Sequence, residues 1–447
     1  MTVGEDIQLG DLTPAAALAR LGDPALPAAT LMLGADAPAM LATADGSIDG
    51  TVEAARPVQI LWSPGKRLVV RYSATVRSGT GTADTTLVAA TGAAIPKWLR
   101  DGTDAQVFAW ARAADPHLPG LPSALDQPTV GRMLETIGLP AATVTLRLRA
   151  YRPTRRAVVR VDHPTATVYL KVVSPREASR LEKIHGFDTG VRTPRTLGVF
   201  RDLGIVVLDS LPGSTLREAL RDPDSPLPEP RRLLDLLDDL QAPDDAPTVG
   251  GPRRTVRRNA RLVRAILPEC GDLLDAVLAE TAVRVDAPRV PVHGDFYESQ
   301  VLVTDAGISG LIDLDRMGVG HRLDDVATMI SHLVAFAQSA PDPLRVTGYA
   351  AAILGAAVDS HDPDLLRRTV AAGLIGMATG PFRAQADDWP AAVARRVAMA
   401  HRWASHPVGL DPASLLGEIG SHGSASSRGH HDQAARPCNP RPTGRDA

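Results

Sequence analysis

The stretch that decides the fold begins at residue 292 and reads VHGDFYESQVLV, and after TDAGIS it continues as GLIDLD over residues 310–315. An apolar strand runs into His-Gly-Asp, where Asp295 follows a conformationally permissive glycine. Two short apolar runs, Val301–Val303 and Leu311–Leu314, flank the sequence Asp-Ala-Gly, which is typical of a hairpin turn. The pattern therefore predicts a strand, a loop and then a hairpin.

The register of this hairpin predicts a polar site. If the turn centres between Ala306 and Gly307, Gln300 lies opposite Asp313, and both lie near the point where Asp295 leaves its strand. Two carboxylates and an amide oxygen suit Mg²⁺, a hard cation that takes oxygen ligands. A carboxylate that does not bind metal can instead accept a proton from a substrate hydroxyl. The alternative is an ordinary hairpin with solvated acids, which the number and spacing of these polar residues disfavour.

These motifs resemble the aminoglycoside phosphotransferase and choline kinase group of the protein-kinase-like superfamily, whose pattern is H-G-D-x-x-x-x-N followed by a hairpin and I-D-x-[DE]. The resemblance implies an α+β, bilobal protein-kinase-like fold with a β-rich N-lobe and a mostly helical C-lobe. It implies transfer of the γ-phosphate of ATP (or GTP) to a hydroxyl of a small molecule. By the same resemblance Asp295 is the catalytic base, and Gln300 and Asp313 bind Mg²⁺.

Position 300 departs from the family pattern, because Gln stands where Asn is usual. Maltokinases of the same superfamily also have Gln here, but they have His and Gly where this chain has Tyr297 and Ser299. A maltokinase-type sugar kinase therefore stays an alternative. A nucleotide-binding pseudokinase with a regulatory role is a second alternative, which the retained acids and Lys171 disfavour. No activation segment of a protein kinase is recognisable after Asp313.

The nucleotide side of the site is expected on strands that precede the hairpin. Lys171 lies in the strand-like run TVYLKVV and is one of only four lysines among 48 basic residues; a snorkelling surface lysine is the alternative. By the resemblance it binds the α- and β-phosphates and pairs with Glu177, with Glu182 as the competitor for that pairing. The stretch VVLDSLPG resembles the family's hinge, which gives three further nucleotide-binding candidates: Val207, Asp209 and Leu211.

The sequence has two further informative features, a short repeat and an aspartate after the hairpin. The pattern P-x-[KR]-R-x-V-V-R occurs at residues 64–71 and again at 153–160, which predicts two related β-rich units, unless two common hairpins have converged. The second copy contains a loop, residues 152–156, whose backbone and arginines are expected to cover phosphates. Asp325, in a family-like D-V-A element, is expected to cap a helix and hold the catalytic loop.

These patterns divide the chain into four parts. We expect an N-terminal α/β appendage with a lobe-like hairpin over residues 1–125 and a nucleotide-binding N-lobe over 126–212. A helical C-lobe with the catalytic loop follows over 213–419, and a disordered tail over 420–447. The tail lacks apolar periodicity.

Composition limits the partners. The net charge of -3 argues against a nucleic-acid binder, and no long apolar run predicts a membrane span or a signal peptide. Two cysteines fit a reducing, cytoplasmic setting. The acceptor and the oligomeric state are left open. A cationic acceptor would require an acidic pocket, and the candidate acids, more simply read as a solvated helix face, are Asp235, Asp238, Asp239, Asp387 and Asp388.

Overall fold

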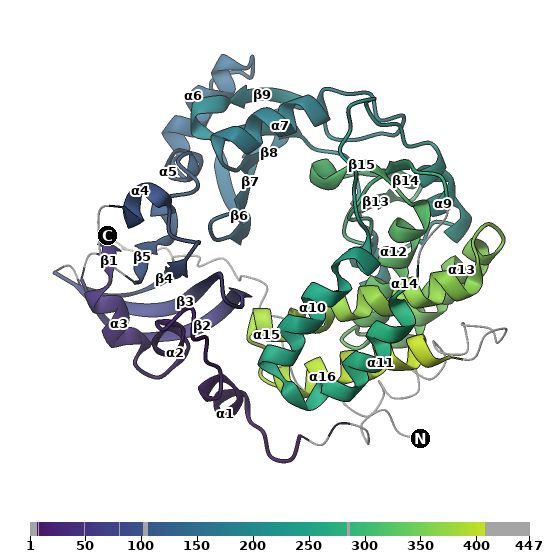
Figure 1. Cartoon of the computed structure of the whole chain (residues 1–447). Coiled ribbons are helices and arrows are strands. Elements are labelled where there is room, and N and C mark those ends of the chain that lie inside the picture. The colour runs from purple at the N-terminus through teal and green to yellow at the C-terminus, as the bar shows by residue number, and fades with distance from the viewer. Residues whose placement is uncertain are drawn as a thin grey trace, which may run out of the picture.

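The computed structural model describes residues 7, 9–48, 50–79, 81–101, 106–283 and 287–406. The expected tail over 420–447 lies outside these residues. The described chain forms three parts arranged in a ring: an N-terminal sheet with helices, a second sheet with helices, and a helical part (Figure 1). The expected α+β fold with a β-rich and a helical lobe is confirmed. No described helix is long and apolar enough to cross a membrane.

The N-terminal part is a five-stranded sheet in the order β1-β5-β4-β3-β2. Its elements are α1 (Pro14–Ala19), α2 (Ala29–Leu33), α3 (Ala37–Thr43), β1 (Asp45–Ser47), β2 (Thr51–Ser63), β3 (Arg67–Ser78), β4 (Gly81–Gly92), α4 (Lys97–Arg100) and β5 (Phe108–Ala111). Successive side chains of a strand point to opposite faces. Leu68 and Val70 therefore join a core shared with α1–α3 and the helical part, whereas Val69 joins the core of the second sheet.

The second sheet has the order β6-β7-β8-β10-β9. Its elements are α5 (Leu121–Ala124), α6 (Gln127–Thr136), β6 (Thr145–Arg152), β7 (Arg156–His163), β8 (Ala166–Val172), α7 (Pro175–His185), β9 (Thr196–Phe200) and β10 (Ile205–Asp209). The helix α7 begins where the Ser174 side chain accepts a hydrogen bond from the backbone N–H of Glu177. This helix packs against β9 and β10 and against the turn at Leu314–Arg316.

The two repeat copies form the same hairpin turn, and each is held by a buried aspartate. Asp23 Oδ2 accepts hydrogen bonds from Trp62 Nε1 at 3.0 Å and from Gly65 N at 2.8 Å. Asp115 Oδ2 likewise accepts from the Tyr151 hydroxyl at 2.9 Å and from the residue-154 backbone N–H at 2.8 Å. Each aspartate begins the sequence D-P-x-L-P. The turns also share a left-handed residue at the same place, with φ of 73° at position 65 and 64° at position 154.

The two copies differ at the position that Lys171 occupies in the second sheet. Lys171 lies opposite Val158 in the second sheet, and the corresponding pair in the first sheet is Ala90 opposite Val69. Ala90 is fully buried. The first copy thus has the hairpin and its aspartate without the strand lysine.

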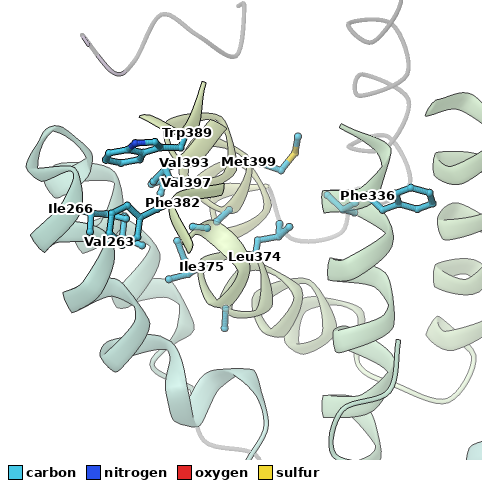
Figure 2. Packing of buried hydrophobic residues seen from close by; sticks show 14 of the residues in the cluster. Val263, Ile266, Phe336, Leu374, Ile375, Phe382, Trp389, Val393, Val397 and Met399 are labelled. Carbon is cyan, nitrogen blue, oxygen red and sulfur yellow. The ribbon is translucent and has the colours of Figure 1, made fainter. Parts of the chain in front are cut away.

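The helical part contains α8 to α16 and five short strands. Its helices are α8 (Leu216–Arg221), α9 (Pro230–Asp238), α10 (Pro252–Ile266), α11 (Gly271–Thr281), α12 (Arg322–Ala337), α13 (Pro343–Val358), α14 (Pro363–Ala378), α15 (Gly380–Ala384) and α16 (Trp389–Ser405). Its strands are β11 (Ser214–Thr215), β12 (Val290–Val292), β13 (Val301–Thr304), β14 (Gly307–Leu311) and β15 (Gly318–Gly320). Figure 2 shows its core, where Phe382 meets Trp389 edge to face at 5.0 Å between ring centroids.

Candidate active site

Two carboxylates of the helical part meet two cations of the second sheet. Lys171 Nζ lies 2.8 Å from Asp313 Oδ1 and also donates to Asp315. The Arg156 guanidinium donates to Asp313 Oδ2 and Asp315 Oδ2, each at 3.0 Å. Lys171 is 5% exposed, so it is not a snorkelling surface lysine. The four charges join the two lobes at one point.

This arrangement determines the charge of Asp313. Burial alone would raise its pKa, but Lys171 and Arg156 together hold the pKa of Asp313 below its ordinary value. The carboxylate is therefore ionised at neutral pH. Its backbone is in the left-handed region at φ 62°, a conformation that Asp and Asn tolerate better than other non-glycine residues.

The hairpin differs from its predicted register. Its turn lies one residue earlier, since Thr304 pairs directly with Gly307, and a bulge between Leu302 and Val303 then moves the pairing one residue back toward the predicted register. The Gln300 carbonyl accepts from the Ile312 backbone N–H at 2.9 Å, so Gln300 lies opposite Ile312 and not Asp313. The predicted proximity is nevertheless present, because the Gln300 side-chain amide lies 3.4 Å from Asp313 Oδ2.

Asp325 holds the loop that begins at His293. Its carboxylate accepts hydrogen bonds from the backbone N–H of His293 at 2.7 Å and of Gly294 at 2.9 Å. Burial raises the pKa of Asp325 to about 6, against the lowering effect of His293 and these two hydrogen bonds. The expectation that Asp325 holds the loop is confirmed. The expectation of a cap is wrong: it lies inside the first turn of α12, after the N-cap residue His321.

The loop also needs a glycine at its bend. Gly294 has φ 77°, and a Cβ there would lie 2.3 Å from the Arg316 carbonyl oxygen. Its neighbour Asp295 is more exposed than Asp313, and the nearest cation is Arg316, whose Nη1 lies 3.9 Å from Asp295 Oδ1. The Asp295 carboxylate thus remains partly exposed to solvent.

Beyond Asp295 the loop is anchored by a buried ion pair. Glu298 is completely buried, and its Oε1 lies 2.6 Å from Arg217 Nη1. The Arg217 guanidinium also lies 4.0 Å from the Phe336 ring centroid. Tyr297 stacks on His332 at 4.1 Å between centroids. These contacts fix Tyr297 and Glu298.

Glu177, the expected partner of Lys171, pairs with another residue instead. The Glu177 carboxylate binds Arg180, with Nε–Oε2 at 3.0 Å, while Lys171 binds the aspartates described above. Glu182, the competitor, binds Arg201 at 2.6 Å. Arg180 in turn donates to the Asp315 carbonyl oxygen at 2.9 Å. Glu177 therefore reaches the site through an arginine.

The three hinge candidates lie at different depths in and after β10. Val207 is buried in mid-strand and pairs with β8 on one side and β9 on the other. Asp209 ends the strand and holds Arg195, accepting from its backbone N–H at 2.6 Å and from Nε at 2.9 Å. Leu211 follows the strand and is half-buried. The backbone of residues 209–211 is thus less enclosed by neighbouring strands than that of Val207, which pairs with a strand on each side.

Sequence reasoning missed three participants. Arg156 was included only as part of a phosphate-covering loop, and Asp315 only as part of a motif, while Arg217 was not singled out. The signal for Arg156 is its place in the repeat, directly after the turn that Asp115 holds. The pairing of Arg217 with Glu298 joins residues 81 positions apart, and no local pattern shows such a contact.

The carboxylate and amide groups of the site suit a Mg²⁺ ion. No group of three or more His, Cys, Asp or Glu side chains that would hold a metal occurs within the described ranges. The site instead has a pair of carboxylates, already neutralised by cations, with an amide beside them. Mg²⁺ is commonly bound by one or two carboxylates and completes its shell with water and phosphate oxygens.

Comparison with known proteins gives one family. Residues 143–362 match the model of APH, the phosphotransferase enzyme family. No curated protein matches the chain.

Solved structures give distant likenesses. Macrolide 2'-phosphotransferase MphH from Brachybacterium faecium is 18% identical, with 61% of this chain and 97% of that chain covered and a TM-score of 0.41. A thermostable mutant of aminoglycoside phosphotransferase APH(4)-Ia, in ternary complex with ADP and hygromycin B, is 17% identical, with 62% and 100% covered and a TM-score of 0.46.

Proposed function

Residues 143–362 belong to the phosphotransferase enzyme family, in line with the expected small-molecule kinase, and from that premise we propose that the chain transfers the γ-phosphate of ATP to a hydroxyl of a small molecule. One observation carries the proposal. Asp313, next to the loop that presents Asp295, is bound by Lys171 from the opposite lobe. Phosphoryl transfer relies on such positioning and charge neutralisation more than on covalent chemistry by the protein.

The step needs few groups. The acceptor oxygen forms a bond to the γ-phosphorus as the bond between that phosphorus and the bridging oxygen of ADP breaks. Asp295 takes the proton of the hydroxyl. Asp313 and Gln300 would hold Mg²⁺, which when bound neutralises charge on the phosphate oxygens. ADP and the phosphorylated acceptor are the products.

The nucleotide side uses residues of the second sheet. Lys171 binds phosphate oxygens, and Glu177 supports it through Arg180, which also holds the Asp315 backbone. The strand end from Asp209 to Leu211 borders the base, and Val207 shapes the strand behind it. GTP in place of ATP would use the same groups.

One observation favours a second reading, the nucleotide-binding pseudokinase. Arg156 donates both of its terminal nitrogens to the aspartates that would bind metal, and Gln300 replaces the usual Asn. A chain in which Arg156 never leaves these aspartates would bind nucleotide without turning it over. A maltokinase-type sugar kinase has no comparable support among the described contacts.

The test is turnover of ATP by the full chain with Mg²⁺ against a panel of amino alcohols, neutral sugars, and hydroxylated carboxylates and phosphate esters. We expect at least one hydroxyl compound to raise turnover. The variant Asp295→Ala serves as the control and should lose this increase. If Mg·ATP binds and no compound raises turnover, the pseudokinase reading replaces the kinase.

A further inference from the structure

Arginines from all three parts of the chain gather beside the site. They come from the two repeat turns, from the residue after Asp315, and from α15 and α16. The cluster, called here the acceptor-side arginines, consists of Arg67, Arg152, Arg155, Arg316, Arg383 and Arg396.

Contacts connect the members of this cluster. Arg152 lies opposite Arg156 in the pairing of β6 and β7, and the carbonyl of its neighbour Tyr151 accepts a hydrogen bond from Arg71 Nη1 at 3.4 Å. Arg71 lies opposite Gln59 of β2, the strand against which α15 packs. Burial lowers the pKa of Arg155, and Arg152, Arg67, Arg156 and Arg316 lower it further. Burial lowers the pKa of Arg383, and Arg152 lowers it further. These directions agree with the contacts that connect the turn at residues 153–155, through β3 and β2, to α15.

Geometry at the helical end agrees. A Cβ built on Gly380 would lie 2.6 Å from Arg396 Nη1 and 4.0 Å from Arg383 Nη2, so the two guanidinium groups lie near one position. Arg396 Nη1 donates to the Met377 carbonyl oxygen at 2.8 Å. The helix α15 itself packs against β2, the strand before the first repeat turn.

The cluster lacks matching acids. Within the described part of the chain, no side-chain hydrogen bond or ion pair is found for Arg152, Arg155 or Arg383. The Nε atoms of Arg383 and Arg396 are buried without a partner there. Arg316 has a single acidic neighbour, Asp295, at 3.9 Å. Buried donors and like charges without counter-ions are costly, which favours an anion at this place.

Three of the five acids that would suit a cationic acceptor form ion pairs with arginines. Asp235 lies 3.4 Å from Arg231, Asp238 lies 3.7 Å from Arg322, and Asp388 lies 2.6 Å from Arg395. Asp235 and Asp238 belong to α9, and Asp388 precedes α16. None of these ion pairs involves Asp295.

We propose that the acceptor is an anionic hydroxyl compound, whose phosphate or carboxylate group binds between Arg152 and Arg383. The inference rests on the proposed function, because it assigns the chemistry of the acceptor of that reaction. The anionic group would lie on the side of Asp295 where Arg316 stands. Guanidinium groups bind phosphate and carboxylate through paired, charge-assisted hydrogen bonds.

The probe is inorganic sulfate, titrated by calorimetry into the full chain saturated with Mg·AMP-PNP, with chloride at matched ionic strength as the reference. We expect sulfate to bind the wild type and to bind Arg383→Gln and Arg152→Gln roughly ten- to a hundredfold more weakly, the loss of one charge-assisted hydrogen bond. Arg232→Gln, on the solvent face of α9 with its side chain 69% exposed, is the matched control and should bind as the wild type does. Circular dichroism of each variant checks that it folds.

A second measurement uses matched acceptors: glycerol, glycerol 3-phosphate, glycerate and choline. Either anionic compound should compete with sulfate, and Arg383→Gln should reduce that competition. The proposal is overturned if sulfate binds Arg383→Gln, Arg152→Gln and Arg232→Gln alike, or if choline competes better than the anions. If Mg·AMP-PNP does not bind at all, the proposed function fails, and the sulfate titration of the nucleotide-free variants still decides the arginine site.

Discussion

Lys171 Nζ lies 2.8 Å from Asp313 Oδ1, so a buried lysine of one lobe neutralises the principal acid of the other. Removing the lysine leaves Asp313 with Arg156 and takes away the only lysine of the second sheet that faces the helical part. We expect Lys171→Met to bind Mg·AMP-PNP at least about tenfold more weakly, a loss of about 1.4 kcal/mol. Lys183→Met, at an exposed position of α7, is the matched control. Equal affinities in the two variants, measured by calorimetry, would argue against a phosphate-binding role for Lys171.

The depressed pKa of Asp313 predicts a pH dependence of stability. An acid whose pKa is lower in the folded state contributes stability that is present above its unfolded pKa, about 3.9, and is lost as the pH falls through the folded value. Asp313→Asn keeps a residue that tolerates positive φ. The difference in unfolding free energy between wild type and this variant should be constant from about pH 5 to 7 and shrink below about pH 4, by at most about 1.4 kcal/mol per pH unit. A difference that grows on acidification would contradict the ion pairing.

The buried pair between Glu298 and Arg217 anchors the catalytic loop. Glu298→Gln leaves Arg217, whose side chain is 33% exposed, with a weaker, neutral acceptor, so we expect a loss of about 1.5–3 kcal/mol, the range for hydrogen bonds to charged groups. Chemical denaturation followed by circular dichroism measures the loss. Asp235→Asn breaks an exposed ion pair of α9 instead and should cost at most about 1 kcal/mol. Similar losses in both variants would mean that the Glu298 contact does not stabilise the loop.

Asp23 and Asp115 hold equivalent turns, but we expect only one of them to affect nucleotide binding. Asp23→Asn and Asp115→Asn each keep one oxygen and replace the other with an NH2 group, so at least one of the donors around each side chain loses its acceptor, which costs about 1–3 kcal/mol. Only the turn held by Asp115 leads into Arg156 and the site. We therefore expect only Asp115→Asn to change the affinity for Mg·AMP-PNP. Equal effects of both variants on that affinity would contradict the assignment of the two copies.

Local patterns predicted much of this molecule. The strand before His293, the hairpin after Gln300 and the strand with Lys171 all follow from apolar runs bounded by turn residues. The repeat also follows from sequence, because the same turn needs the same residues. The residue with positive φ shows the limit of that reasoning, because it is Gly65 in one copy and Thr154 in the other. In both copies a buried aspartate accepts a hydrogen bond from the backbone N–H of this residue, and the local sequence does not show that contact.

What the sequence could not show depends on distant contacts. The hairpin turn lies one residue earlier than the sequence predicts, and the bulge that partly offsets this displacement has no local signature. The Lys171 partner was expected on the next helix, yet the charges of Asp313 and Asp315, more than 140 positions away, are the ones in contact. The acceptor-side arginines come from three separate parts of the chain. In an arginine-rich sequence such a cluster has no local signature.

The central claim is tested most directly by single-turnover transfer of labelled γ-phosphate from Mg·ATP to the hydroxyl compound that most raises turnover. In Asp295→Asn, general-base assistance is lost while the neighbouring carboxylates stay, so the rate should fall by about 10²–10⁴ with the affinity for Mg·AMP-PNP unchanged. A transfer rate in Asp295→Asn equal to that of the wild type would contradict the account.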